Sequence, residues 1–295
     1  MQYNKTFKTY SEQLQILIDR GLLVKDEEKA KQYLKKFNYY RFSGYCIPFQ
    51  DIKDRFNNNT HFSDILKLCD FDSQLRTFLY DVLEKIEIQL RALMAYYFGQ
   101  KYGPWGYIDF LNFSLDFKYY EWITKIKDEI DRSNEIFIKH YKDTYTDNQD
   151  LPIWMVTEIM SLGGLSNMFS GMKAPDQKDL SSEFGVKRPV VKSWLHHLTY
   201  IRNMCAHHCR IWNRSWAIKP LVPDERSWSF LTDRENKLFV TFSMLNFLTN
   251  KFSLSINIPE ELENIISKFD VSFPFSLKEK MGFPDNYNEI ELWKK

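Results

Sequence analysis

The chain has 295 residues, of which 44% are hydrophobic and 17% aromatic, and its mean hydropathy is −0.46. This composition is typical of a folded globular protein and excludes an intrinsically disordered chain. The formal net charge of +1 excludes nucleic-acid binding that depends on overall charge, so any such binding must come from a local basic surface.

No targeting or membrane segment is visible. The N-terminal stretch MQYNKTFKTYSEQ lacks the apolar core of a signal peptide, and no run approaches the ~20 apolar residues of a membrane span. The four cysteines do not form the dense pattern of a disulfide-stabilised secreted domain. We therefore expect a cytoplasmic protein that does not enter the membrane.

Apolar residues recur at helical spacing through most of the chain. The longest such run extends from His61 to Phe98 and meets Gly99, Gly103 and Pro104, which predict its end. Strand patterns are scarce, with Phe252–Pro259 as a short candidate. The sequence predicts an all-α protein with further helices at Ser11–Arg20, Asp26–Phe37, Phe117–Tyr141, Ile153–Phe169, Pro189–Trp212, Asp233–Phe252 and Glu260–Phe269.

We expect one compact unit in three parts. Residues 1–60 form an N-terminal helical extension, residues 61–215 a helical core, and residues 216–295 a C-terminal helical extension. Gly163 and Gly164 lie inside a helical pattern, where they predict a kink or a close helix contact.

The segment RNMCAHHCRIWNR, residues 202–214, concentrates polar and cationic groups. Cys205 and Cys209 could supply two zinc ligands from one helix face, but a structural zinc site needs four ligands and no second ligand pair follows. On a helical wheel they continue an apolar stripe from Trp194 through Leu198 and Ile201 to Trp212. We interpret both cysteines as core residues and predict no metal or other cofactor.

Arg202 lies near this apolar stripe, where a cation is rarely left unpaired. Glu87 and Glu158 are its candidate acidic partners, and the alternative is that Arg202 points into a cleft and binds phosphate. Asn203 and His207 share the opposite, polar face of the predicted helix because they are four residues apart. His196 and His197 are expected to be surface-exposed and partly buried, respectively.

Arg202 precedes His207 by five residues, and an arginine and a histidine at this spacing can cleave RNA without a metal. The 2′-hydroxyl attacks the adjacent phosphate, the histidine transfers protons, and the arginine neutralises charge on the phosphate oxygens. The spacing is weak evidence alone, since RFNNNTH, from Arg55 to His61, also fits. That stretch reads as an Asn-rich loop leading into the long helix, and we reject it as a site.

The residues around the spacing carry a resemblance. RNMCAHHCRIWNR is similar to the signature of the Abi-like AbiD/AbiF family, bacterial abortive-infection proteins with a HEPN-type helical core. Three more stretches, in the expected order, resemble motifs of that family: YYRFSGYCIPFQ from Tyr39, IEIQLRALMAYYFG from Ile86 and LPIWMVTEIMSLGGLSNMF from Leu151. The final ~80 residues add little to the resemblance.

The resemblance implies a HEPN-like bundle and a metal-independent endoribonuclease of phage-defence or toxin–antitoxin systems. It implies that Arg202 and His207 are catalytic, although His208 also satisfies the spacing, and that Asn203 is a supporting residue. A homodimer and an RNA substrate are implied, together with a noncoding RNA antitoxin. We place Arg210, Asn213 and Arg214 on the RNA-contact surface; the alternative is a non-catalytic RNA-binding or protein-interaction module.

Overall fold

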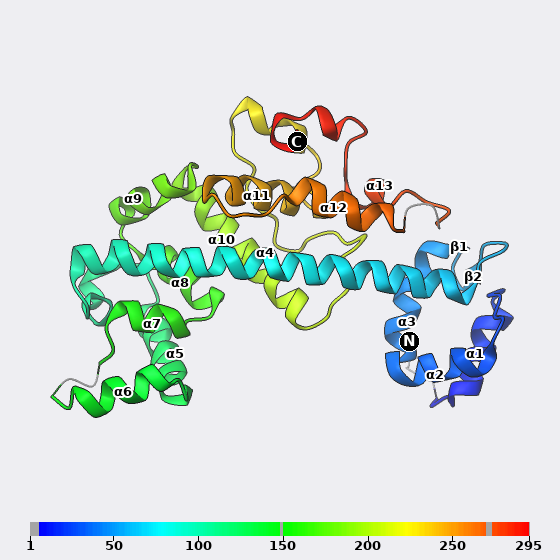
Figure 1. Ribbon diagram of the computed structural model, residues 1–295, viewed down its shortest axis with the longest axis horizontal. Helices are drawn as coiled ribbons and strands as arrows, with labels where there is room; N and C mark the ends of the chain where they lie inside the picture. The colour runs from blue at the N-terminus through cyan, green and yellow to red at the C-terminus, as the bar shows by residue number, and fades with distance from the viewer. Residues whose placement is uncertain (1–5, 148–149, 270–272, 295) are drawn as a thin grey trace. The chain divides into compact units, whose positions relative to one another are not determined.

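The computed structural model describes residues 6–147, 150–269 and 273–294. Within these residues the regular structure is helical except for one small antiparallel hairpin of β1 (Gln50–Ile52) and β2 (Arg55–Phe56), which confirms the all-α prediction (Figure 1). None of the helices described is both long enough and apolar enough to cross a membrane.

The contacts divide the chain into two units, Met1–Leu75 with Leu262–Lys280, and Arg76–Glu261 with Met281–Lys295. The predicted three-part division at residues 60/61 and 215/216 stays a prediction. The long helix α4 (Phe62–Tyr102) contributes its first turns to the first unit and its remaining turns to the second.

The first unit is built from short helices and the hairpin. Helix α1 begins with a capping box in which Thr9 and Glu12 satisfy each other's main-chain N–H groups. Aromatic rings of Tyr33, Phe42 and Phe62 pack together in its core. Its helices besides α4 are α1 (Tyr10–Asp19), α2 (Glu27–Phe37), α3 (Tyr39–Cys46), a 3-10 turn (Ile47–Phe49), α12 (Ile258–Ser267) and α13 (Leu277–Met281), the last two crossing the unit boundary by a few residues.

The second unit contains the segment of interest. Helix α10 packs against α8 and α9, and α11, whose side chains are nearly all buried, packs against α9. Its α-helices after α4 are α5 (Tyr119–Arg132), α6 (Ile136–Thr144), α7 (Ile153–Ile159), α8 (Leu162–Gly171), α9 (Ala174–Phe184), α10 (Arg188–Ala206) and α11 (Leu238–Lys251). Its 3-10 helices are Gly106–Ile108, Phe110–Asn112, Arg226–Leu231, Tyr287–Glu289 and Glu291–Trp293.

Helix α4 ends four residues after the predicted end at Phe98 and runs through Gly99. A Cβ atom at Gly99 would lie 3.2 Å from a methyl group of Ile153, so this glycine permits close packing of α7 and does not end the helix. The helix ends at Tyr102, before Gly103, whose φ of 74° lies in the left-handed region that glycine adopts freely. His61 immediately precedes α4, and its main-chain N–H bonds the Asp64 carboxylate, as expected for a helix entry.

Two predicted helices are each divided in the structure. The predicted Phe117–Tyr141 helix becomes α5 and α6, which are separated around Ser133. The predicted Ile153–Phe169 helix becomes α7 and α8, because Ser161 caps a new N-terminus by accepting a hydrogen bond from the Gly164 N–H at 3.2 Å. The glycine pair therefore lies in the first turn of a helix.

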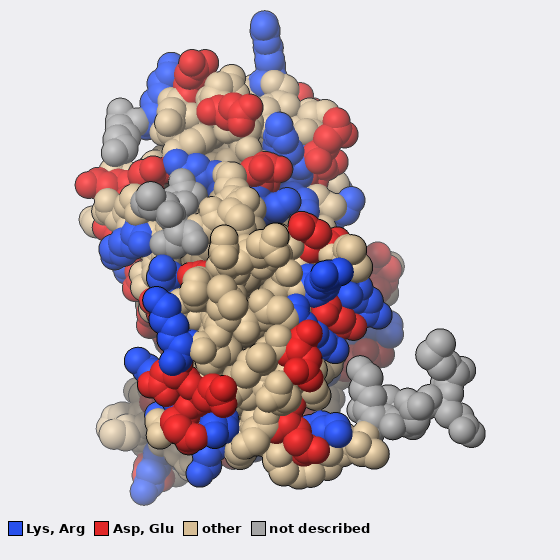
Figure 2. Space-filling view, turned by 90° about the vertical axis from the view of Figure 1, so that its right-hand side faces the viewer, with Lys and Arg blue, Asp and Glu red and all other residues tan. Residues whose placement is uncertain are grey.

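The surface carries both signs of charge. On the face shown in Figure 2, Lys and Arg side chains are interspersed with Asp and Glu side chains, and uncharged residues form a band between them. This distribution agrees with a net charge of +1. A site for an anionic ligand must therefore be found in local groups of side chains.

Candidate nucleic-acid site at the end of α10

Helix α10 presents its apolar side to the core. Trp194, Leu198, Ile201 and Cys205 are all buried at the predicted spacing. Cys209, which was expected to continue this stripe, is only half-buried and lies beyond the helix. Among the residues described, no group of three or more His, Cys, Asp or Glu side chains lies close enough to hold a metal ion.

The helix ends at Ala206, six residues before the predicted end at Trp212. The N–H of Cys209 bonds the Met204 carbonyl at 2.9 Å, and the N–H of His208 bonds the Cys205 carbonyl at 3.0 Å. These two bonds form a Schellman motif, in which the residue at the position of His208 adopts a left-handed conformation. His208 does so, with a φ of 54°. The motif ends the helix without a glycine, which is why the sequence pattern predicted a longer helix.

Buried anchors hold the segment that follows. Ile211 and Trp212 are fully buried, and the Cys209 carbonyl accepts a hydrogen bond of 3.5 Å from Nη1 of Arg76. Arg76 is itself buried on α4, and sequence reasoning did not single it out. The signal in the sequence that could have identified Arg76 is a cation at a position that continues the apolar spacing of the long helix.

Arg202 lies beside Glu87, one of its two candidate partners. Its Nε is 3.8 Å from Glu87 Oε2, which is an ion-pair distance but too long for a hydrogen bond. Glu158 is exposed and forms no ion pair within the described part of the chain. Glu87 is buried, whereas the Arg202 side chain remains 31% exposed, so the ion pair does not close Arg202 off from solvent.

Glu87 also binds a second arginine. Nη2 of Arg91 donates to Glu87 Oε1 at 2.6 Å and to the Met160 carbonyl at 3.1 Å. The break between α7 and α8 exposes this carbonyl as an acceptor, because no further helical turn uses it. The Nε atoms of Arg91 and Arg202 are buried and have no hydrogen-bond partner in the described structure.

The group therefore has an excess of positive charge. Two guanidinium groups share one carboxylate, and two buried N–H donors are unsatisfied. The exposed part of the Arg202 guanidinium can therefore donate to an anion with free lone pairs, which would balance this charge. A phosphate oxygen is an anion of this kind.

The other predicted residues lie around the helix end. Asn203 and His207 are exposed on successive turns, and the His207 N–H bonds the Asn203 carbonyl at 2.9 Å. Five residues separate Arg202 from His207, so at 100° per residue their side chains leave the helix about 140° apart. Beyond the helix, His208 and Arg214 are exposed and Arg210 and Asn213 are half-buried, with Asn213 at a φ of 50°.

His197 is fully buried, and not partly buried as the sequence suggested, whereas its neighbour His196 is exposed. Its Nδ1 lies 2.6 Å from the Ile218 carbonyl and its Nε2 lies 3.0 Å from the Thr241 hydroxyl. Nδ1 donates, because a carbonyl only accepts; in the neutral ring Nε2 then accepts a hydrogen bond from the Thr241 hydroxyl. Burial lowers the pKa of His197 to about 4, so this histidine is a structural residue.

Comparison with protein-family models matches residues 32–213 to the family described as Abi-like protein. The match covers more than half of the chain and includes α4, α10 and the segment after α10 up to Asn213. Comparisons with curated proteins and with solved structures find no match.

Proposed function

Because the chain belongs to the Abi-like protein family, we propose that it is a HEPN-type, metal-independent endoribonuclease of antiphage abortive infection or toxin–antitoxin defence. The observation that carries the proposal is the excess cationic charge around Arg202, with its unsatisfied and partly accessible guanidinium, on the helix that ends in exposed histidines. The substrate is RNA, because the chemistry requires a 2′-hydroxyl next to a phosphate.

In this reaction the 2′-oxygen forms a bond to phosphorus and the 5′-oxygen leaves. His207 transfers a proton as general base or acid, and Arg202 neutralises the charge that builds on the phosphate oxygens. The products carry a 2′,3′-cyclic phosphate and a 5′-hydroxyl. Asn203 orients the histidine or the RNA, and Arg210, Asn213 and Arg214 extend the RNA contacts.

Removal of one proton and delivery of another need two groups, and this chain carries one convincing Arg–His pair. A symmetric homodimer that brings two α10 ends together supplies both groups and offsets the divergence of Arg202 and His207 within one chain. A noncoding RNA is the proposed silencing partner. We expect a mass in solution twice the 35.6 kDa of the chain, and a monomer at every concentration contradicts this part of the proposal.

The alternative function is a non-catalytic RNA-binding or protein-interaction module. The contact between Arg202 and Glu87 favours it, because a structural ion pair also explains an arginine beside the apolar face. The two functions differ in whether His207 is required for a chemical step.

Incubation of the purified protein with total RNA in EDTA separates them. We expect cleavage with 2′,3′-cyclic phosphate ends, and a loss of about 100-fold or more in the folded variants Arg202→Ala and His207→Ala. His196→Ala is the matched control, because His196 is exposed on the same helix, and it should cleave like the wild type. If the wild type does not cleave RNA while toxicity in cells persists in the variants, the enzyme proposal is wrong.

A further inference from the structure

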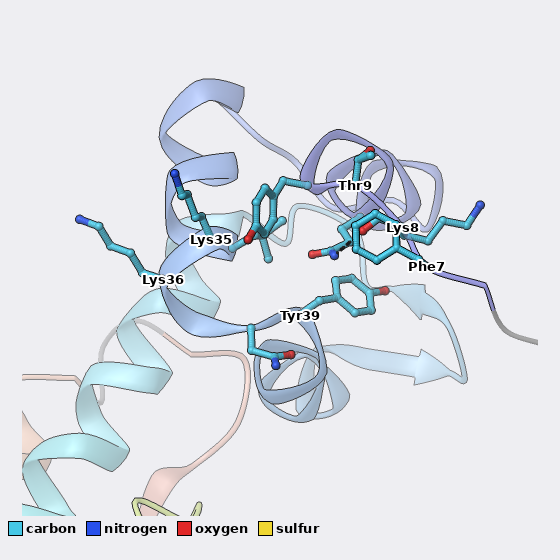
Figure 3. A pocket seen from close by; sticks show the side chains of 10 residues that line it. Phe7, Lys8, Thr9, Lys35, Lys36 and Tyr39 are labelled. Atoms are coloured by element: carbon cyan, nitrogen blue, oxygen red, sulfur yellow. Dashed lines mark hydrogen bonds between the residues drawn. The ribbon is translucent and has the colours of Figure 1, made fainter.

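A pocket in the first unit lies far along the sequence from Arg202. It has a volume of about 450 Å³, within the range of small-ligand sites, and is formed by the start of α1 and the junction of α2 with α3. Figure 3 shows the rings of Phe7 and Tyr39 on one side of it and the side chains of Lys35 and Lys36 extending from the other. Its lining is Phe7, Lys8, Thr9, Tyr10, Gln13, Leu34, Lys35, Lys36, Asn38 and Tyr39.

The charge of this lining is positive. It contains three lysines and no carboxylate. Lys8 has a partner in Glu12, at 3.5 Å, whereas Lys35 and Lys36 are exposed and form no ion pair among the residues described. Two adjacent uncompensated ammonium groups at the rim of a pocket attract an anionic ligand.

The aromatic side chains of the pocket are available for stacking. Phe7 is 87% exposed, although burial of a phenylalanine is favourable by about 2 kcal/mol. Neither Phe7 nor Tyr39 packs against another aromatic ring within the described ranges. A flat aromatic ligand would cover apolar surface that the folded chain leaves in water.

A buried polar atom gives the third feature. The amide of Gln13 is fixed because its Nε2 donates to the Lys8 carbonyl at 2.8 Å. Its Oε1 is buried without a hydrogen-bond partner, although the residue lines the pocket. An unsatisfied acceptor in a pocket favours a ligand that supplies an N–H group.

From these three features we infer that the pocket binds one unpaired nucleotide. The base stacks on Phe7 and Tyr39 and donates an N–H to Gln13 Oε1, and its phosphates lie against Lys35 and Lys36. The nucleotide belongs to an RNA strand or is free in solution, and both sources have the same chemistry. The choice of the strand rests on the proposed ribonuclease function, for which the pocket would be a second contact with RNA.

Binding of a fluorescent six-nucleotide single-stranded RNA to the full chain tests the inference. The measurement is made in a His207→Ala background, so that cleavage cannot remove the probe. Phe7→Leu keeps an apolar side chain but removes the ring, and we expect at least about fivefold weaker binding, since stacking contributes ~1–3 kcal/mol per base. Because Phe7 is highly exposed, this variant should keep the stability of its parent.

The lysines are tested by the salt dependence of binding. The double variant Lys35→Glu/Lys36→Glu should bind more weakly and lose about 1.4 from the slope of log affinity against log salt, or ~0.7 for each lost phosphate contact. Lys53→Glu/Lys67→Glu is the matched control, because these two exposed lysines belong to the same unit, lie outside the pocket and make the same change of charge.

The outcomes are distinct. Equal losses in the two double variants, or unchanged binding in Phe7→Leu, overturn the inference; unchanged binding in Phe7→Leu together with a loss at Lys35 and Lys36 alone indicates that the lysines bind phosphate without a stacked base. Adenosine monophosphate and unlabelled RNA are each used to displace the fluorescent RNA. If the two compete equally well, the pocket is assigned to a free nucleotide. If adenosine monophosphate competes tenfold or more weakly than the RNA, the pocket is assigned to a strand. Since binding is measured without cleavage, failure here leaves the nuclease proposal standing, and failure to cleave leaves this test intact.

Discussion

Arg202 carries a permanent charge beside the apolar side of α10, and Glu87 partly compensates that charge. The carboxylate is nearer to Arg91, at 2.6 Å, than to Arg202, at 3.8 Å, so Arg202 is held less firmly. A phosphate that approaches Arg202 can therefore replace a weak contact without breaking the stronger one. Glu87 thus serves as a positioning residue in the proposed site.

Glu87→Gln tests this arrangement. Loss of the carboxylate leaves two arginines close together without a counter-charge, and we expect a loss of about 3 kcal/mol in the free energy of unfolding. Urea denaturation measures the loss, and Glu84→Gln, an exposed change on the same helix, should have almost no effect. Equal stability of the two variants would show that the three-residue group contributes little.

His208 occupies a left-handed backbone position, and this allows its side chain and its backbone to be tested separately. His208→Gly relieves the strain, and His208→Ala retains it, so we expect the glycine variant to be about 1 kcal/mol more stable in urea denaturation than the alanine variant. Both variants lack the imidazole. If His207 is the catalytic histidine, both cleave RNA; loss of cleavage in both assigns the role to His208.

At the candidate site, sequence reasoning gave a partner of Arg202 but not the geometry of the group. Glu87 was named as a candidate because a cation beside an apolar face is rarely left unpaired, and Glu87 Oε2 lies 3.8 Å from Arg202 Nε. The second arginine, Arg91, follows Glu87 by four residues, so the sequence places the two side chains on neighbouring turns of the helix. Its bond to the Met160 carbonyl depends on a break between α7 and α8 that no apolar periodicity reveals.

At the scale of elements, helices were predicted well and their ends poorly. The core of α4 was found because its apolar spacing persists over many turns, but the helix continued through Gly99, where close packing of Ile153 requires a small residue. Helix α10 ended early because His208 adopts the backbone conformation usually given to glycine. Helices α3 and α9 were not predicted, since tertiary packing stabilises short helices with little pattern of their own.

The end of α8 gives a prediction about packing. A Cβ atom at Gly171 would lie 2.5 Å from ring atoms of Phe117, so Gly171→Ala should destabilise the protein by about 1–3 kcal/mol. Gly44→Ala is the control, because a Cβ there meets nothing within 4 Å and alanine favours the helix by up to about 1 kcal/mol. Thermal unfolding should show a lower midpoint for the first variant and an equal or higher midpoint for the second. The reverse order would contradict the close approach of Phe117.

For the whole molecule, the spacing of apolar residues predicted the helical class, and composition predicted the near balance of charges, since net charge is a sum over the chain. Composition did not predict where cations outnumber carboxylates, because that depends on which residues folding brings together. The lysines at the α2–α3 junction and the arginines around Glu87 are such groups, one in each unit.

The stability of the whole chain should fall in mild acid because of His197. Its pKa is about 4 in the folded state and 6.5 ordinarily, so the unfolded state binds the proton more readily and stability decreases as the pH falls from about 6.5 to 4. Between pH 7 and pH 5 we expect a loss of about 2 kcal/mol in urea denaturation from this residue. His197→Asn should remove this part of the pH dependence while His196→Ala retains it; the opposite result would contradict the burial of a neutral ring.

The anchors on either side of the exposed histidines fix the length of that segment. Between the end of α10 at Ala206 and the buried Ile211 there are four residues, and the chain between the two anchors spans at most about 17 Å. An insertion or deletion here would displace Ile211 and Trp212 from the core or unwind the helix end, whereas a substitution at an exposed position disturbs neither. The segment between Ala206 and Ile211 can therefore acquire new properties by substitution of its side chains, but not by a change in its number of residues.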